Sequence, residues 1–333
     1  MDDLEEARFR IYAIEDGAVR AQALAFCLSA GFFETLAEAP RTFEQLLEHH
    51  SLARRVLPAL LAFLVSEGLV ERDHDGRFQN SEATSTFLVR SSPRHIGGRG
   101  LLFQGFYPAI EHLPESLATG RPWTASGQHD MFGGFSEADQ RWFAEGMFAN
   151  AIHGGRALVE TIDLSAATRL LDVGGNAGGY AIAICEANPH LRATIFDLEP
   201  IRPLAIERIT AAGLASRVEF VAGSFFDDPL PRGHALLLLS SILHDWDEPD
   251  CRRILAACHA ALEPGATIIV TEPMLAEDYT GPHHPAASGL TMALLGGENR
   301  TRGQIAEMLL AAGFSEPWLG PLGPQNSVVT ARR

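Results

Sequence analysis

The sequence predicts an α/β protein in which an all-α N-terminal domain precedes a doubly wound sheet domain. Three features carry this prediction: short helical patterns that include a hairpin, near-continuous apolar strands separated by helices after about residue 168, and a glycine turn after the first of those strands. Apolar strands that alternate with helices indicate a parallel sheet covered on both faces. With 333 residues and 46% hydrophobic content, the chain is large enough to fill two cores.

The first domain is predicted to span residues 1–92 and to be winged-helix-like. Helical patterns between about Ile11 and Leu88 are joined by the hairpin pattern ERDHDGRFQNSE, in which Asp75-Gly76 forms the turn. The third helix is mostly apolar and carries only Arg54 and Arg55 at its start, which disfavours DNA binding. An apolar, charge-poor helical unit is better explained as a partner surface, and a second copy of the chain is the simplest partner.

Charge and composition exclude several classes of partner. The formal net charge is −16, and all 26 basic residues are arginine, so nucleic acid would be repelled. No apolar run is long enough to span a membrane, and the acidic start MDDLEEARFR does not resemble a secretory signal. The four cysteines show no CxxC pairing. We therefore expect a cytoplasmic protein with no membrane or nucleic-acid partner.

Residues 161–333 are predicted to form the sheet domain, with residues 93–160 as a helical linker that contributes to a ligand pocket. The strand patterns are RLLDVG, ATIFDL, VEFVAG, ALLLLSSIL and ATIIVTEP, and the helices between them include YAIAICEAN and EPDCRRILAACHAAL. In such a Rossmann-like sheet the ligand lies beyond the carboxyl ends of the strands. The residues that follow each strand are therefore the candidates for a binding site.

The turn in LLDVGGNAGG, residues 170–179, indicates which nucleotide is bound. A dinucleotide fingerprint needs glycine at the position of Asn176, because a side chain there obstructs the approach to a pyrophosphate. S-adenosylmethionine has no phosphate and is positively charged, which suits Asp172 at the first strand end. Asp197, 25 residues later, can accept hydrogen bonds from both ribose hydroxyls, and the ring of Phe225 can pack on adenine.

Several segments together resemble a known family over essentially the full chain. They are GFFETLAE, LVSEGLVE, LLDVGGNAGG, FDLEPI, RVEFVAGSFF, SSILHDWDEPDCRRIL, IIVTEPML and GGENRTRGQIAEMLLAAGF. They are similar to class I S-adenosylmethionine-dependent O-methyltransferases of the caffeate, hydroxyindole and polyketide-tailoring type. The resemblance implies a dimer-forming N-terminal domain, a Rossmann-like catalytic domain, S-adenosyl-L-methionine as cofactor and a small-molecule acceptor in secondary metabolism.

The predicted cofactor contacts follow from the strand ends and the resemblance. They are Asp172, Gly174, Gly175, Asn176, Asp197, Leu198, Gly223, Ser224, Phe225 and Ser240. The chain departs from the family pattern at Asn176, where a third glycine is usual, and at Ser224, where an acid is usual. It also departs at Glu199, which replaces a proline, and at Ser240 and Ser241, where a basic residue is frequent. We expect these departures to rearrange contacts near adenine.

His244 is the predicted general base. It follows the strand ALLLLSSIL at the ligand edge of the sheet, and the unperturbed pKa of histidine lies near neutral pH. A buried carboxylate beside it would fix its tautomer, and Glu272 and Glu298 match the family positions that flank the catalytic histidine. Asp245 and Asp247 are interpreted as residues at the start of a helix that begins at about Glu248, where acids are favoured.

The acceptor site is predicted from the family positions and from apolar character. Its candidate residues are Phe106, Tyr107, Phe143, Met147, Asn150 and Met292. An apolar lining suits a flat phenol, although ordinary helix packing accounts for the same residues. No metal is predicted, and a minor alternative places one at His283-His284. Three other functions stay open: methylation of sulfur or carbon on the same fold, a winged-helix ligand-sensing regulator, and an NAD-dependent oxidoreductase.

Overall fold

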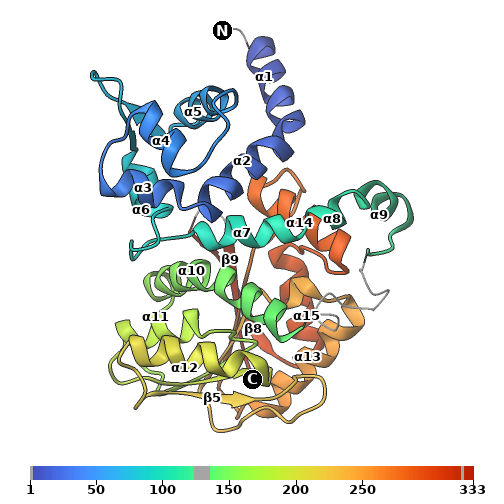
Figure 1. Cartoon of the computed structure of the whole chain (residues 1–333). Coiled ribbons are helices and arrows are strands. Elements are labelled where there is room, and N and C mark those ends of the chain that lie inside the picture. The colour runs from blue at the N-terminus through green and yellow to red at the C-terminus, as the bar shows by residue number, and fades with distance from the viewer. Residues whose placement is uncertain (1–2, 124–135, 324–325) are drawn as a thin grey trace. The chain divides into compact units, whose positions relative to one another are not determined.

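The computed structural model describes residues 3–123, 136–323 and 326–333. The chain divides into two compact units, Met1–Phe106 and Tyr107–Arg333. The division lies inside the segment that the sequence predicted as a helical linker. Figure 1 colours both units along the chain.

The N-terminal unit contains seven helices and one hairpin within its described residues. The helices are α1 (Asp3–Glu15), α2 (Gly17–Ser29), α3 (Phe32–Glu38), α4 (Phe43–His49), α5 (Leu57–Ser66), α6 (Glu82–Phe87) and α7 (Gly97–Gly105), and the hairpin strands are β1 (Val70–Arg72) and β2 (Phe78–Asn80). The predicted hairpin is confirmed, because Arg72 pairs with Phe78 and Gly76 takes the positive φ of 77° that its turn requires. The core of this unit is built on fully buried side chains such as Phe32, Phe33 and Leu57.

Helix α1 differs from the other helices of this unit because none of its described side chains is buried. Its exposed apolar residues include Phe9, which is 50% exposed, Ile11, which is 56% exposed, and Ile14, which is 80% exposed. Water-exposed apolar side chains at this density are typical of a helix that packs against another chain.

The second unit contains a seven-stranded mixed sheet. Its strands are β3 (Arg169–Val173), β4 (Arg192–Asp197), β5 (Val218–Ala222), β6 (Leu236–Ser240), β7 (Thr267–Glu272), β8 (Ser315–Leu322) and β9 (Asn326–Arg332), in the order β5-β4-β3-β6-β7-β9-β8. The five predicted strands are parallel. Strands β8 and β9 pair antiparallel beyond β7 and were not predicted. The strand order reverses between β3 and β6, which is where such sheets bind their ligands.

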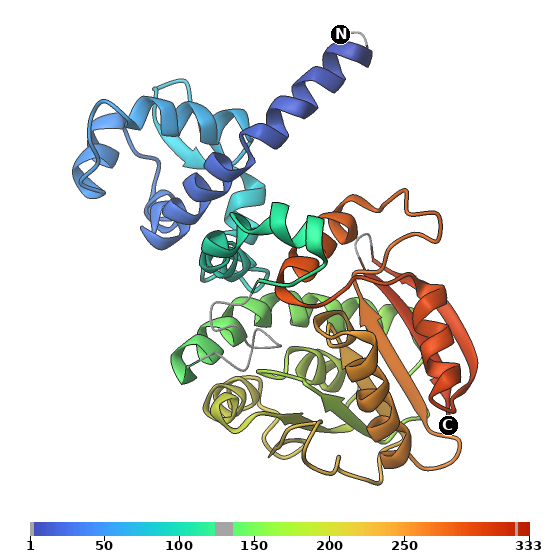
Figure 2. The same cartoon turned by 90° about the vertical axis from the view of Figure 1, so that its right-hand side faces the viewer.

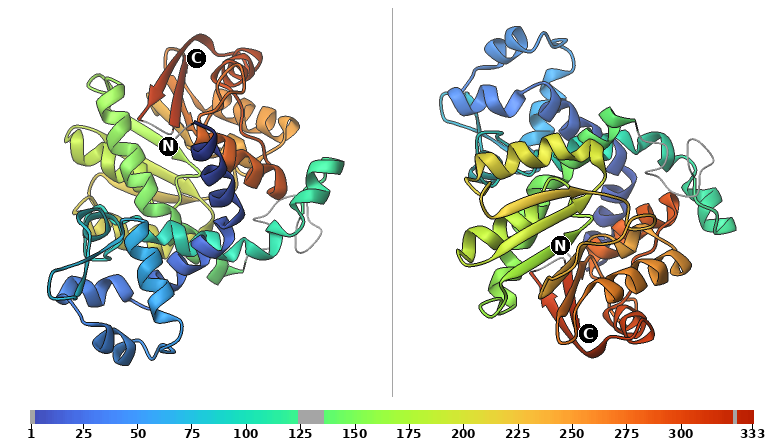
Figure 3. Two further views of the ribbon diagram at one scale, coloured as in Figure 1. Left: turned by 90° about the horizontal axis from the view of Figure 1, so that it is seen from above. Right: turned by 90° about the horizontal axis from the view of Figure 1, so that it is seen from below.

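Helices cover both faces of this sheet, as predicted. Helices α10 (Glu137–Thr161), α11 (Gly179–Ala187) and α12 (Arg202–Ala211) lie on one face, and α13 (Glu248–Ala261) and α15 (Arg302–Ala311) lie on the other (Figures 1 and 2). Alternate strand residues enter separate cores: Leu170 packs with the first group of helices and Leu171 with the second. The two views in Figure 3 show the same three layers from opposite ends.

Three further helices complete this unit at the ligand edge. They are α8 (Tyr107–Ile110), α9 (Leu113–Thr119) and α14 (His283–Leu295), and α14 packs against both α8 and α9. The backbone N–H of Trp123 donates to the carbonyl of Leu294, and the Trp123 ring stacks on His112 at 5.1 Å. Helix α14 also contacts the short 3₁₀ turn η2 (Leu243–Asp245) that follows β6.

Candidate active site

The glycine turn after β3 is shaped by positive backbone φ angles. Gly174 has φ of 69° and Gly178 has φ of 83°. A Cβ atom on Gly175 would lie 2.6 Å from Cγ of Asp172, so the side chain of Asp172 occupies the space beneath the turn. The local sequence therefore requires glycine here both for backbone conformation and for room.

Asn176 takes the left-handed conformation that a glycine would otherwise provide. Its φ is 52°, and its side-chain Oδ1 accepts a hydrogen bond from the N–H of Ala177 at 2.6 Å. Its own backbone N–H donates to Oδ2 of Asp197 at 2.7 Å. Asparagine tolerates this conformation because its side chain bonds locally. Asn176 thus ties the turn after β3 to the carboxylate at the end of β4.

We predict that alanine at Asn176 destabilises the protein more than glycine does. Alanine keeps the steric cost of the left-handed conformation, about 1–2 kcal/mol, and loses the side-chain bond, whereas glycine removes that cost. Urea unfolding of Asn176→Ala and Asn176→Gly measures the difference. Equal stability of the two variants would contradict this account of the turn.

Asp172 is a buried carboxylate, and its one backbone hydrogen-bonding neighbour within the described residues is Ala181, which opposes the rise of its pKa. It is 1% exposed, and neither of its oxygens has a hydrogen bond of good geometry among the described residues. Burial raises its pKa to about 7. An unpaired buried carboxylate is costly, and a positively charged ligand group would offset that cost. The Asp172 carboxylate therefore fits a cationic cofactor and offers no favourable contact to a phosphate.

The next two strand ends carry the other predicted cofactor residues. Each oxygen of Asp197 accepts one backbone N–H, from Asn176 and from Leu198, and the partial burial of Asp197 raises its pKa to about 6. A carboxylate has further lone pairs, so it can still accept hydroxyl groups of a ligand. The ring of Phe225 lies 5.9 Å from the Trp246 ring in an edge contact, which fixes its orientation after β5.

Ser224, Gly223 and Ser240 complete the set. The hydroxyl of Ser224 donates to Oδ2 of Asp227 at 3.0 Å, so the loop after β5 carries a carboxylate that sequence reasoning missed. A Cβ atom on Gly223 would lie 2.4 Å from the ring of Phe196, so only glycine fits there. Ser240, at the end of β6, is a hydrogen-bonding neighbour of the buried Tyr180; burial raises the Tyr180 pKa, and Ser240 opposes that rise.

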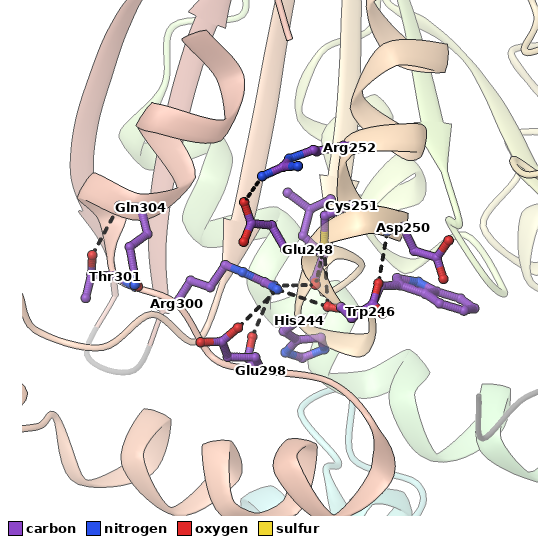
Figure 4. A network of polar contacts seen from close by, with 12 residues as sticks. His244, Trp246, Glu248, Asp250, Cys251, Arg252, Glu298, Arg300, Thr301 and Gln304 are labelled. Carbon is purple, nitrogen blue, oxygen red and sulfur yellow. Dashed lines mark hydrogen bonds and ion pairs between the residues drawn. The ribbon is translucent and has the colours of Figure 1, made fainter. Parts of the chain in front are cut away.

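His244 lies on turn η2, directly beyond the end of β6 (Figure 4). Its side chain is 12% exposed, and its Nε2 lies 3.4 Å from Oδ1 of Asp245. Burial lowers its pKa to about 4; the Asn299 side chain opposes that shift and the charge of Arg300 adds to it. The imidazole is therefore neutral at pH 7 and able to accept a proton.

Glu272 binds the backbone of the histidine turn. Its Oε1 accepts the N–H groups of Ile242 at 3.2 Å, Leu243 at 2.6 Å and His244 at 3.3 Å. The carboxylate is 1% exposed, and burial raises its pKa to about 7. The structure thus brings Glu272 to His244, as predicted, but to the peptide N–H. No ion pair or hydrogen bond between Glu272 and the imidazole is found among the described residues.

Glu298 lies on the outer side of the same turn. Its side chain is 61% exposed and lies 3.2 Å from the guanidinium of Arg300, which is 4% exposed (Figure 4). Its backbone N–H donates to the carbonyl of His244 at 2.8 Å. Within the described part of the chain, its carboxylate has no recorded contact with the imidazole.

Arg300 binds the carbonyl groups of the histidine turn. It was not predicted as a site residue. Its guanidinium donates to the carbonyls of Leu243 at 2.8 Å and Trp246 at 3.1 Å. Gly297 allows this loop to approach, because a Cβ atom there would lie 2.0 Å from the carbonyl oxygen of His244. The turn is therefore held at its N–H groups by Glu272 and at its carbonyls by Arg300.

Asn299 is a further site residue that the sequence did not predict. It is 5% exposed, and its Nδ2 donates to the carbonyl of Pro285 and to Oγ of Ser288, both at 2.7 Å, which fixes the side chain against α14. Its Oδ1 and Nδ1 of His244 are both buried without a hydrogen bond of good geometry, and its side chain interacts with the imidazole. In the sequence Asn299 stands next to Glu298 in GGENRT. That position alone does not show which of these two side chains faces the protein interior.

The two acids next to His244 have different surroundings. Asp247 accepts the N–H of Asp250 at 3.0 Å and caps α13, which confirms its predicted place at a helix start. Asp245 is 12% exposed, and burial together with the charge of Glu272 raises its pKa well above the usual value. Asp245 therefore belongs to the surroundings of the imidazole and not to the helix.

The predicted acceptor residues lie on several helices. Phe143, Met147 and Asn150 are half-buried on α10, and their spacing of four and three residues places them along one face. Tyr107 on α8 and Met292 on α14 are half-buried, and the carbonyl of Met292 accepts the N–H of Gly297 at 2.8 Å. Phe106 is the last residue of the N-terminal unit. Their binding roles stay predictions.

The described residues hold neither a metal-binding cluster nor a membrane-spanning helix. They contain no group of three or more His, Cys, Asp or Glu side chains arranged to hold a metal ion, and this includes the surroundings of His283-His284. None of the helices in the described ranges combines the length and the apolar composition needed to cross a membrane.

Comparison with known proteins gives matches over both units. Residues 13–90 match the model of the O-methyltransferase dimerisation domain, and residues 115–315 match that of the O-methyltransferase domain. The 3-hydroxy-5-methyl-1-naphthoate 3-O-methyltransferase of Streptomyces sahachiroi is 36% identical over 90% of this chain and 87% of its own. The tetracenomycin polyketide synthesis 8-O-methyl transferase of Streptomyces glaucescens is 31% identical over 89% and 88%. The crystal structure of human N-acetylserotonin methyltransferase in complex with SAM superimposes with a TM-score of 0.89 at 25% identity, covering 100% of this chain and 98% of that one.

Proposed function

The chain belongs to the S-adenosylmethionine-dependent O-methyltransferase family, and from that premise we propose that it methylates a hydroxyl group of a small aromatic molecule in secondary metabolism. The observation that carries this proposal is His244, a neutral imidazole on a turn at the ligand edge of the sheet. The name of one relative mentions a naphthoate and that of another mentions polyketide synthesis. Both names support an aromatic acceptor.

The cofactor supplies a methyl group that is already activated by its bond to a positively charged sulfur. Asp172 would then face the positive charge of the cofactor, and Asp197 would accept its ribose hydroxyls. The ring of Phe225, held by Trp246, offers a surface for adenine. The remaining tasks of the protein are to align the acceptor oxygen and to receive one proton, and the position of His244 at the ligand edge supports it for the second task.

We predict that affinity for S-adenosylhomocysteine rises with pH through about 7. The pKa of Asp172 is raised to about 7 in the free protein, and the positively charged amino group of the ligand favours the ionised form and lowers that pKa. Binding below pH 7 must therefore expel a proton, so the dissociation constant increases by up to about tenfold per pH unit lost, and affinity levels off above pH 7. Isothermal titration calorimetry from pH 5.5 to 8.5 measures this.

The control for this prediction is Asp172→Asn, which removes the titrating group. It should bind S-adenosylhomocysteine more weakly at pH 8 and with a flatter pH dependence. An unchanged slope in the variant would assign the effect to another acid, such as Asp197, whose pKa is raised to about 6.

We also propose that the protein is a homodimer through its N-terminal unit. The match to a dimerisation domain and the exposed apolar side chains of α1 support this assembly. Light scattering coupled to size-exclusion chromatography should give the mass of two chains.

The test of the proposed function is methyl transfer from S-adenosylmethionine carrying a labelled methyl group to a panel of hydroxylated naphthoates and phenols. The proposal expects the label on oxygen, and a label on sulfur or carbon would overturn it. A thermal-shift comparison should show stabilisation by S-adenosylhomocysteine and none by NAD. Stabilisation by NAD, or salt-sensitive binding to specific DNA, would favour the oxidoreductase or the regulator instead.

A further inference from the structure

The imidazole of His244 has unusual neighbours for a general base. Its own turn contributes Asp245, the loop after α14 contributes Asn299 and the buried Arg300, and β7 contributes Glu272. Helix α14 contributes no residues with a permanent charge, since its sequence is HHPAASGLTMALL. Glu272 is engaged with backbone N–H groups, and Glu298 faces Arg300 on the exposed side. The side chain that raises the pKa of this imidazole is thus an amide, and the backbone of Ser241 raises it as well.

An amide stabilises an imidazolium less than a carboxylate does. A carboxylate that accepts from Nδ1–H compensates the positive charge formed when Nε2 takes a proton, whereas the amide oxygen of Asn299 provides only a dipole. The guanidinium of Arg300, 4% exposed and bonded to the carbonyls of Leu243 and Trp246, opposes that charge. Asp245 lies 3.4 Å from Nε2, and burial together with the charge of Glu272 raises its pKa well above the usual value, which weakens its support of the imidazolium.

The packing of the loop keeps Asn299, and not the carboxylate of Glu298, next to the imidazole. Its Nδ2 is bonded to the Pro285 carbonyl and to Ser288, so Oδ1 is the atom left for the imidazole. The carboxylate of Glu298, one residue earlier, is 61% exposed on the other side of the loop. The packing of the loop against α14 therefore determines that an amide, which stabilises the imidazolium only weakly, lies beside His244.

We propose, on the basis of the proposed function, that the acceptor is an acidic hydroxyl and that Asn299 sets this preference. The substrate class is a phenol or enol whose hydroxyl is conjugated to an electron-withdrawing group and is substantially ionised near neutral pH. His244 then positions the oxygen and takes a proton that the acceptor releases readily. Asn299 is a positioning residue that determines specificity through His244.

The chemical step balances without any additional reactant. The hydroxyl proton passes to Nε2 of His244 or to solvent, and the acceptor oxygen forms a bond to the methyl carbon. The bond between that carbon and the cofactor sulfur breaks, and its electron pair neutralises the sulfur. When the hydroxyl is weakly acidic, the first event limits the rate, because the imidazole is a poor base in these surroundings.

The first experiment compares substituted 2-naphthols of similar size, with hydroxyl pKa values from about 10, that of a tyrosine-like phenol, down to about 7. At pH 7 the wild-type kcat/KM should rise by at least about tenfold from the least to the most acidic acceptor. For the least acidic acceptor, the rate should increase with pH from 7 to 9. An acceptor series with no such trend, or one that favours the least acidic naphthol, overturns the proposal.

The second experiment replaces Asn299 with a carboxylate. Asn299→Asp and Asn299→Glu should raise the pKa of His244, followed by the NMR shift of its ring protons, and should reduce the preference for acidic acceptors by about tenfold. Asn188→Asp, which adds the same charge at the end of α11, is the matched control and should leave the preference unchanged. An unaltered His244 pKa in both Asn299 variants overturns the role of Asn299, and the wild-type series stays decisive if neither variant folds.

The outcome also separates this inference from the proposed function. Methyl transfer to oxygen with no dependence on acceptor acidity refutes the inference alone. Absence of transfer to oxygen with every naphthol and naphthoate, in protein that binds S-adenosylhomocysteine, refutes the proposed function.

Discussion

Replacement of Glu272 by alanine is expected to lower the free energy of unfolding by about 3–5 kcal/mol. The substitution leaves the N–H groups of Ile242, Leu243 and His244 without their shared acceptor in a buried site. It also removes the negative charge that faces the buried Arg300. A loss of this size is a large part of the stability of an ordinary domain.

Urea unfolding at pH 8 measures the loss, since the raised pKa of Glu272, about 7, leaves the carboxylate ionised there. Glu272→Gln is the control, because an amide oxygen still accepts the N–H groups but carries no charge. It should cost less than the alanine variant. Equal losses would assign the whole effect to charge, and a loss below about 1 kcal/mol for alanine would contradict the role of Glu272 in holding the turn.

Replacement of His244 by alanine is expected to lower the rate of methyl transfer by about 10²–10⁴-fold, with the smaller losses for the most acidic acceptors. The imidazole receives the acceptor proton, whereas the predicted cofactor contacts other than Ser240 lie at other strand ends and stay in place. Single-turnover transfer of a labelled methyl group measures the rate, and calorimetry should find the affinity for S-adenosylhomocysteine unchanged.

His190→Ala is the matched control for this prediction, because His190 is exposed beyond the end of α11 and outside the site. It should keep the wild-type rate. A His244→Ala enzyme that transfers methyl groups at close to the wild-type rate for every acceptor would remove His244 from the mechanism.

Much of the fold could be predicted from the sequence, because buried parallel strands produce uninterrupted apolar runs. The segments RLLDVG and ATIIVTEP became β3 and β7, and Asp247 caps α13 as expected. Strands β8 and β9 escaped prediction. The segment SEPWLGPL contains two prolines and a glycine, which are unfavourable in strands, and it forms β8 because it lies at the edge of the sheet.

The site was predictable in position but not in its contacts. The carboxyl ends of adjacent parallel strands must meet at one edge, so Asp172, Asp197 and His244 could be assigned to it from spacing alone. Which atoms meet depends on side-chain direction at the ends of strands and in loops. Glu272 therefore binds peptide N–H groups instead of the imidazole, and Asn299, not Glu298, is packed inward.

The histidine turn is held by two buried charges and by one glycine that fits against a carbonyl oxygen. Glu272, Arg300 and Gly297 stabilise the turn and at the same time fix the position of His244. Most single substitutions at these residues should therefore impair both stability and activity. The half-buried side chains of α8, α10 and α14 do not hold the histidine turn in this way. Natural variation and laboratory evolution toward new acceptors should therefore accumulate on those helices, while the turn changes only through coupled replacements.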